Sequence, residues 1–168
     1  VLCPGTEGNL GDELCDLPGW LQAGVPLAIG SDSHVTRNWP EELRWLEYGQ
    51  RLQLRQRNVA ASARSEPSTA ARLWNAALPA GARAAGLRHW GLMAGARPDL
   101  LVLDTGSPAL AGLPATHLLD GLVFAAAEPP WREVIVAGEV VLRDGRHAAQ
   151  DAITQRFREV MDSLWAGG

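Results

Sequence analysis

One short segment, Gly30-Ser31-Asp32-Ser33-His34, brings together side chains that could take part in a chemical reaction. It follows an apolar run, residues 26–29, of the kind that forms a buried parallel strand. A carboxylate at the end of such a strand can ligate a metal ion and accept a proton from a metal-bound water. It can equally serve only to cap a loop, so the residues alone leave Asp32 open between these roles. For His34 three roles remain: a substrate contact, a hydrogen-bond partner of a metal ligand, or an exposed loop residue.

A second polar cluster occupies the stretch from Thr6 to Asp12, which is rich in glycine and small polar groups. The sequence predicts a loop here, with Glu7 and Asn9 as candidate contacts to a polar substrate. A hydrogen-bonded loop without a ligand is an equally good interpretation. The apolar residues 1–3 before it predict a short strand. If this strand neighbours the one that carries Asp32 in a barrel, both clusters open onto the same mouth.

A complete metal site is not evident in the sequence. His89, His117 and His147 lie far along the chain, and exposed or structural roles are expected for them. The sequence contains no His-x-His and no His-x-x-x-His pattern. Because a zinc site needs three or four protein ligands, either Asp32 is not a ligand or its partners lie elsewhere.

Composition predicts a globular domain with a core: 46% of the 168 residues are apolar and 20% are charged. The net charge of −4 argues against a general nucleic-acid binder, and no apolar run is long enough to span a membrane. Cys3 and Cys15 fit neither a disulfide framework nor a metal site, so we expect thiols in a reducing compartment, with the cytoplasm as default. The chain begins without Met, as a strand entering a loop, so a preceding N-terminal portion is expected.

Helical patterns dominate the first half of the chain. The clearest covers residues 40–57, with acidic residues near its start and basic residues near its end. Its apolar side chains should pack on the barrel: Leu43, Trp45, Leu46, Tyr48 and Leu52. A short helix is expected at 17–23, and another begins near Ser68 and is interrupted by Pro79 and Gly81.

The second half has a different pattern. Residues 99–104 predict a strand, and 132–137 with 140–143 predict a β-hairpin. Residues 118–125 suit either a strand or a short helix. Residues 151–165 predict a closing helix with one apolar stripe.

These segments resemble the metal-dependent amidohydrolase superfamily, whose members build a (β/α)₈ barrel and a smaller β-sandwich. Residues 91–104 resemble the return from barrel to sandwich, and residues 134–147 resemble the terminal hairpin. Within the superfamily, residues 3–12, 30–34 and 41–52 most resemble the formimidoylglutamate deiminase family.

The fold class implied by the resemblance is α/β. It corresponds to the C-terminal part of a (β/α)₈ TIM barrel over residues 1–85, a β-sandwich segment over 86–150 and a C-terminal helix over 151–168.

The resemblance also implies a chemistry. Asp32 would be a zinc ligand and the general base that takes a proton from the zinc-bound water, with Ser33, His34, Glu7 and Asn9 as weaker substrate-binding candidates. N-formimino-L-glutamate would be hydrolysed to N-formyl-L-glutamate and ammonia in histidine degradation. The full-length enzyme would be a cytoplasmic homodimer without nucleic-acid or membrane partners. Because the family's other metal ligands have no counterpart here, the isolated chain is expected neither to bind zinc tightly nor to turn over substrate.

Two alternatives stay open. One is another aminohydrolase of the superfamily, similar to guanine deaminase or the chlorohydrolases and acting on a purine, a guanidine or an amidine. The other is a non-catalytic, truncated module in which Asp32 only caps a loop.

Overall fold

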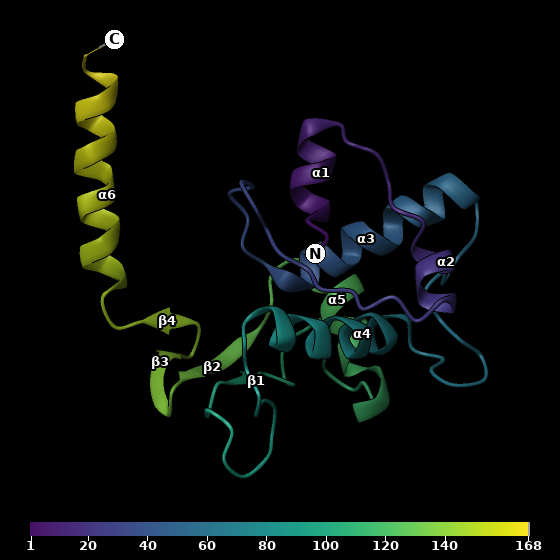
Figure 1. Cartoon of the computed structure of the whole chain (residues 1–168). Coiled ribbons are helices and arrows are strands. Elements are labelled where there is room, and N and C mark those ends of the chain that lie inside the picture. Colours follow the sequence, from purple (N-terminus) through teal and green to yellow (C-terminus); the bar gives the residue numbers. More distant parts are fainter. Residues whose placement is uncertain (168) are drawn as a thin grey trace. The chain divides into compact units, whose positions relative to one another are not determined.

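The computed structural model describes residues 1–167, which form two compact units (Figure 1). Unit 1 comprises Val1–Trp90 and Thr105–Pro129, and unit 2 comprises Gly91–Asp104 and the chain from Pro130 onward. Helices dominate unit 1, whereas unit 2 contains a sheet and one helix. No helix in the described part of the chain is both long and apolar enough to span a membrane. The assignment of barrel and sandwich segments remains a prediction.

The helices of unit 1 confirm most of the sequence pattern. The short helix expected at 17–23 is present, and the ambiguous segment 118–125 is helical. The long helix expected at 40–57 is also present but ends at Leu54, where Arg55 is in the left-handed conformation. The elements are α1 (Pro4–Leu10), α2 (Leu17–Gln22), α3 (Trp39–Leu54), α4 (Thr69–Ala84), the 3₁₀ turn η1 (Ala115–His117) and α5 (Leu118–Phe124).

Two predictions about these helices were wrong. The expected loop after Thr6 is helix α1, which begins with Pro4 and ends at Gly11 in the left-handed conformation (φ +79°). A proline at the first position and a left-handed glycine after the last turn are strong helix boundaries. Helix α4 also continues through Pro79 to Ala84. Its residues Ala80 and Ala82, beyond the proline, are buried, so packing offsets a proline cost of about 3 kcal/mol.

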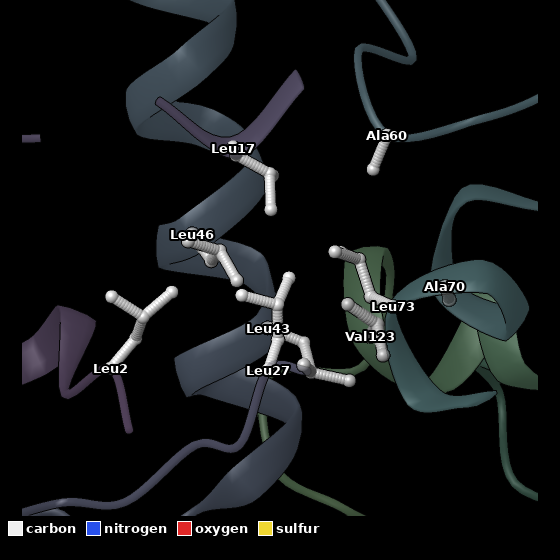
Figure 2. Packing of buried hydrophobic residues seen from close by; sticks show 9 residues of the cluster. All are labelled: Leu2, Leu17, Leu27, Leu43, Leu46, Ala60, Ala70, Leu73 and Val123. Carbon is white, nitrogen blue, oxygen red and sulfur yellow. The ribbon is translucent and has the colours of Figure 1, made fainter. Parts of the chain in front are cut away.

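The core of unit 1 forms around one face of α3 (Figure 2). Leu43 and Leu46 lie on this face and are buried. Trp45 and Leu52, which were also expected to pack on the barrel, are 50% and 80% exposed in this structure. Tyr48 is 37% exposed, and its ring stacks on Phe124. The pattern combined two faces of the helix, of which only one is buried. The core cluster contains Leu2, Leu17, Leu27, Leu43, Leu46, Ala60, Ala70, Leu73 and Val123.

Unit 2 contains a four-stranded antiparallel sheet in the order β1-β2-β3-β4. The predicted hairpin is confirmed, with Ala137 and Gly138 at its turn, both at positive φ as tight hairpin turns require. The predicted closing helix is also confirmed, and its apolar residues Ile153, Phe157 and Leu164 are each more than half exposed. The elements are β1 (Leu100–Leu103), β2 (Trp131–Val136), β3 (Glu139–Arg143), β4 (Arg146–His147) and α6 (Gln150–Trp165).

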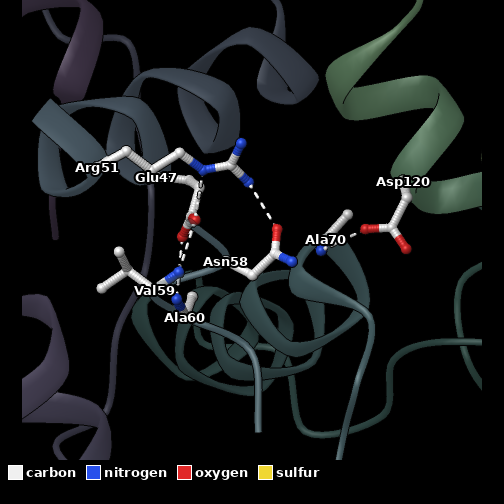
Figure 3. A network of polar contacts seen from close by, with 7 residues as sticks. All are labelled: Glu47, Arg51, Asn58, Val59, Ala60, Ala70 and Asp120. Atoms are coloured by element: carbon white, nitrogen blue, oxygen red, sulfur yellow. Dashed lines mark hydrogen bonds and ion pairs between the residues drawn. The ribbon is translucent and has the colours of Figure 1, made fainter. Parts of the chain in front are cut away.

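A buried carboxylate on α3 fastens the segment that follows this helix (Figure 3). Glu47 is fully buried. It accepts hydrogen bonds from the backbone N–H groups of Val59 at 2.8 Å and Ala60 at 3.0 Å. The Nε–H of Arg51 donates to the same carboxylate at 2.7 Å and compensates its charge. Since Ala60 belongs to the core cluster, this network connects the end of α3 to the core.

Replacing Glu47 by alanine should lower the free energy of unfolding by about 3–5 kcal/mol, because two backbone N–H groups and a guanidinium lose their acceptor. Urea denaturation followed by tryptophan fluorescence measures the loss. The control is Gln53→Ala on the exposed face of the same helix, which should stay within about 0.5 kcal/mol of the unsubstituted protein. Equal effects of the two substitutions would contradict a structural role for the buried carboxylate.

Candidate functional site

The two polar segments identified in the sequence, after Cys3 and after Gly30, follow two short stretches of chain that pair with each other. Leu2 and Ile29 form a parallel bridge. The Leu2 N–H donates to the Ala28 carbonyl at 2.8 Å, and the Gly30 N–H donates to the Leu2 carbonyl at 2.9 Å. The expected strands are shorter than predicted, since this single bridge is the strand pairing that the structure shows there. Their parallel pairing is confirmed, and it brings the residues after Cys3 next to those after Gly30.

Asp32 lies in a tight turn closed by a 3.0 Å hydrogen bond from the His34 N–H to the Ser31 carbonyl. Its side chain is exposed and its φ is +46°. Aspartate adopts this left-handed region more readily than most residues, yet the conformation costs about 1 kcal/mol. The carboxylate is therefore accessible, while its backbone depends on neighbouring contacts to stay in this geometry.

Thr6 supplies such contacts from helix α1. Its hydroxyl donates to the Ser31 carbonyl at 2.6 Å and accepts from the His34 N–H at 2.9 Å. The two partners stand on either side of Asp32 in the sequence. Thr6 is only 3% exposed, so its hydroxyl serves the protein and not the solvent.

Glu42 holds the start of α1 against α3. Its Oε2 accepts a 2.8 Å hydrogen bond from the Gly5 N–H, and the side chain is 4% exposed. A Cβ atom at position 5 would lie 2.8 Å from the Glu42 Oε1, so glycine permits this close approach. The sequence interpretation used Glu42 only as a charge near the helix start. Its spacing of four residues from Leu46 placed it on the buried face, and this signal was missed.

The weaker substrate-binding candidates have different surroundings. Ser33 and Asn9 are exposed. Glu7 is half-buried and turns back to accept the Cys3 N–H at 2.8 Å. His34 is half-buried, and its Nδ1 accepts the Thr36 N–H at 3.2 Å. The structure thus brings Asp32, Ser33 and His34 together in one turn, whereas Asn9 lies near the far end of α1.

Negative charge gathers around Cys3. Burial raises the pKa of the Cys3 thiol, and the charges of Asp32, Glu7 and Glu42 raise it further. The thiol therefore stays protonated at neutral pH. Carboxylates from the two polar segments and from α3 thus all favour the protonated form of this thiol.

The chain alone does not fit a zinc ion. Within residues 1–167, no three histidine, cysteine, aspartate or glutamate side chains come together in a way that could hold a metal. A zinc site needs three or four protein ligands. His89, His117 and His147 are exposed, as expected. Asp32 offers at most one ligand.

The pH dependence of stability should report on Glu42. Burial raises the pKa of its carboxyl above the ordinary value, although the Gly5 N–H and His34 oppose the shift. A carboxyl with a higher pKa in the folded state binds more protons when folded, so its stabilising effect is present at low pH and is lost as pH rises through the folded pKa. Glutamine keeps an oxygen for the Gly5 N–H and does not titrate. In Glu42→Gln, the fall in Tm above the ordinary carboxyl pKa should therefore be smaller.

The measurement is Tm over a series of pH values, with Glu13→Gln, an exposed carboxylate, as the control that should leave the profile unchanged. Superimposable profiles for Glu42→Gln and the unsubstituted protein would contradict the role of the buried carboxyl.

Comparison with known proteins connects this geometry to deiminases. No family profile matches the chain. The chain is 45% identical over 163 residues to formimidoylglutamate deiminase of Pseudomonas aeruginosa, which covers 97% of this chain and 36% of that protein. It is 30% identical over 148 residues to 5-methylthioadenosine/S-adenosylhomocysteine deaminase of Halobacterium salinarum, covering 86% of this chain and 32% of that protein.

Solved structures show the same relationship. An amidohydrolase from Brucella melitensis matches with a TM-score of 0.87 and 37% identity, over 98% of this chain and 36% of that chain. An adenosine deaminase from Xanthomonas campestris, solved with bound zinc, shares the fold with a TM-score of 0.78 and 23% identity, over 98% of this chain and 37% of that chain. The chain spans about a third of the length of these relatives. The resemblance carried by its motifs is confirmed: over nearly its whole length, the chain is homologous to part of formimidoylglutamate deiminase and shares the fold of the matching third of a solved amidohydrolase.

Proposed function

We propose that this chain is the C-terminal portion of a deiminase that hydrolyses N-formimino-L-glutamate to N-formyl-L-glutamate and ammonia. The observation that carries the proposal is the 45% identity to formimidoylglutamate deiminase across 97% of the chain. The exposed Asp32 carboxylate, which follows the short parallel pairing of residues 2 and 29, supports the proposal.

The proposed reaction needs a proton acceptor. Water adds to the formimino carbon, the C–N bond to the terminal nitrogen breaks, and that nitrogen leaves as ammonia. Both protons of the water end on the departing nitrogen. We assign the first transfer to the carboxylate of Asp32, which accepts a proton from the attacking water and passes it to that nitrogen. Two features support this role: the carboxylate is accessible, and the buried hydroxyl of Thr6 forms hydrogen bonds with the turn that carries it.

We further propose that the longer protein is a cytoplasmic zinc enzyme in which Asp32 is one ligand. The exposed carboxylate of Asp32, an oxygen ligand that zinc accepts, supports this assignment. The other ligands would have to come from residues beyond those described here, in keeping with the third of the relatives' length that this chain spans.

Of the substrate-side candidates, Ser33 and Asn9 have exposed side chains available for a ligand. Glu7 and His34 are already engaged with backbone groups of the protein. We therefore propose that Ser33, which is adjacent to Asp32, is the strongest of the four candidates for a substrate contact.

Asp32→Asn in the full-length protein should lower the rate of ammonia release from N-formimino-L-glutamate by about 10²–10⁴-fold, since an amide cannot accept the proton. A coupled ammonia assay measures the rate. The matched control is Asp162→Asn on exposed α6, which should leave the rate unchanged. The same assay with 5-methylthioadenosine and S-adenosylhomocysteine tests the alternative substrates suggested by the second group of relatives.

Ammonia release from those nucleosides but not from N-formimino-L-glutamate would reject the proposed substrate and keep the reaction type. No release from any of them would leave two alternatives: an aminohydrolase acting on another purine, guanidine or amidine, and a non-catalytic module.

The isolated 168-residue chain should bind less than stoichiometric zinc, because its described residues offer one ligand where three or four are needed. Equilibrium dialysis followed by elemental analysis measures the occupancy, with the full-length protein as the positive control. One tightly bound zinc per isolated chain would contradict both the metal-site geometry and the proposed sharing of ligands.

A further inference from the structure

We propose that Thr6, held in place by Glu42, is a positioning residue that sets the orientation of Asp32. The inference rests on the proposed function, since it assigns Asp32 to the reaction. Thr6 touches neither substrate nor metal in this proposal and acts only through the turn that carries Asp32.

The hydroxyl of Thr6 uses both of its hydrogen-bonding capacities on this turn. It donates to the Ser31 carbonyl at 2.6 Å and accepts from the His34 N–H at 2.9 Å. One bond is made before Asp32 and the other after it, so the hydroxyl spans the residue. The Ser31 carbonyl and the His34 N–H, which flank Asp32, are thereby bonded to the Thr6 hydroxyl, which lies outside the turn.

The turn needs this support because Asp32 is in the left-handed region, at φ +46°. Such a conformation persists where the surrounding structure over-determines it. The turn's own bond, from the His34 N–H to the Ser31 carbonyl at 3.0 Å, closes it. That bond alone does not connect the turn to the rest of the protein, whereas the two bonds to Thr6 connect it to α1.

Helix α1 is in turn fixed to the core. The Glu42 carboxylate accepts the N–H of Gly5, the residue next to Thr6, at 2.8 Å. Glu42 lies on the same buried face of α3 as Leu43 and Leu46. A continuous path of short contacts therefore leads from the core helix through α1 to the turn at Asp32.

Each of the two polar partners in this path is almost inaccessible, with 3% exposure for Thr6 and 4% for Glu42. A substrate-binding role for Thr6 is therefore disfavoured, and removal of its hydroxyl should act on Asp32 and not on substrate affinity. Groups that orient a ligating or reacting carboxylate typically contribute about 10–100-fold to metal affinity or activity.

The test uses three variants of the full-length protein. Thr6→Val has the same shape without the hydroxyl, Thr6→Ser keeps the hydroxyl, and Thr69→Val removes the hydroxyl of a threonine in α4 that is equally buried, at 4% exposure. Zinc affinity is measured by competition with a chromogenic chelator, and kcat and KM by ammonia release. Thermal melts check that each variant folds, which is expected because the turn keeps its internal bond.

Thr6→Val should weaken zinc binding and lower kcat, each by about 10–100-fold, with KM changed by less than about twofold since no substrate contact is lost. Thr6→Ser should restore both quantities, and Thr69→Val should change neither. Unchanged zinc affinity and kcat in a folded Thr6→Val protein would overturn the inference. So would equal losses in Thr6→Val and Thr69→Val.

A failure of the proposed function gives a different result. If ammonia is not released from N-formimino-L-glutamate but Thr6→Val still weakens zinc binding and Thr6→Ser restores it, the positioning role stands and the substrate assignment fails.

Discussion

The structure of unit 1 depends on one face of helix α3, which buries carboxylate side chains together with leucines. Glu42 and Glu47 share the buried side of α3 with Leu43 and Leu46. A buried carboxylate is costly unless hydrogen bonds replace the water it loses. Here both carboxylates accept hydrogen bonds from backbone N–H groups outside the helix, Gly5 in one case and residues 59–60 in the other. The leucines supply most of the burial, and the carboxylates decide which backbone segments lie against the helix.

Much of this architecture was predictable from the sequence because it depends on local signals. The position of α3 follows from Pro40 and the acidic residues near its start, and the hairpin follows from Gly138 between two runs rich in β-branched residues. The failures have a common origin. Pro79 and the glycine-rich stretch after Thr6 indicate breaks when only local propensity is weighed, but tertiary burial and a well-formed helix end outweighed that propensity.

In the candidate site, too, residues marked by a local sequence pattern were predictable, and residues that act through long-range contacts were not. Asp32 was predictable because a polar residue at the end of an apolar strand has a recognisable pattern and because its neighbours resemble a known family. The parallel pairing of its strand with residues 1–3 was also anticipated. Thr6 and Glu42 were not identified, since their importance lies in contacts across 25 and 37 residues of sequence, which no local pattern encodes. For Glu42, an acidic residue in register with core leucines was the available indication.

The surroundings of Cys3 have a consequence for redox chemistry. Thiolates, and not thiols, react with peroxides and alkylating agents, and both the burial of Cys3 and the neighbouring carboxylates favour the thiol. Its sulfur atom would lie 3.4 Å from a Cβ at Gly30, directly beside the segment that leads into the Asp32 turn. A bulky oxidised sulfur would press on that segment. Burial first, and the neighbouring carboxylates second, favour the protonated and less reactive form of this sulfur.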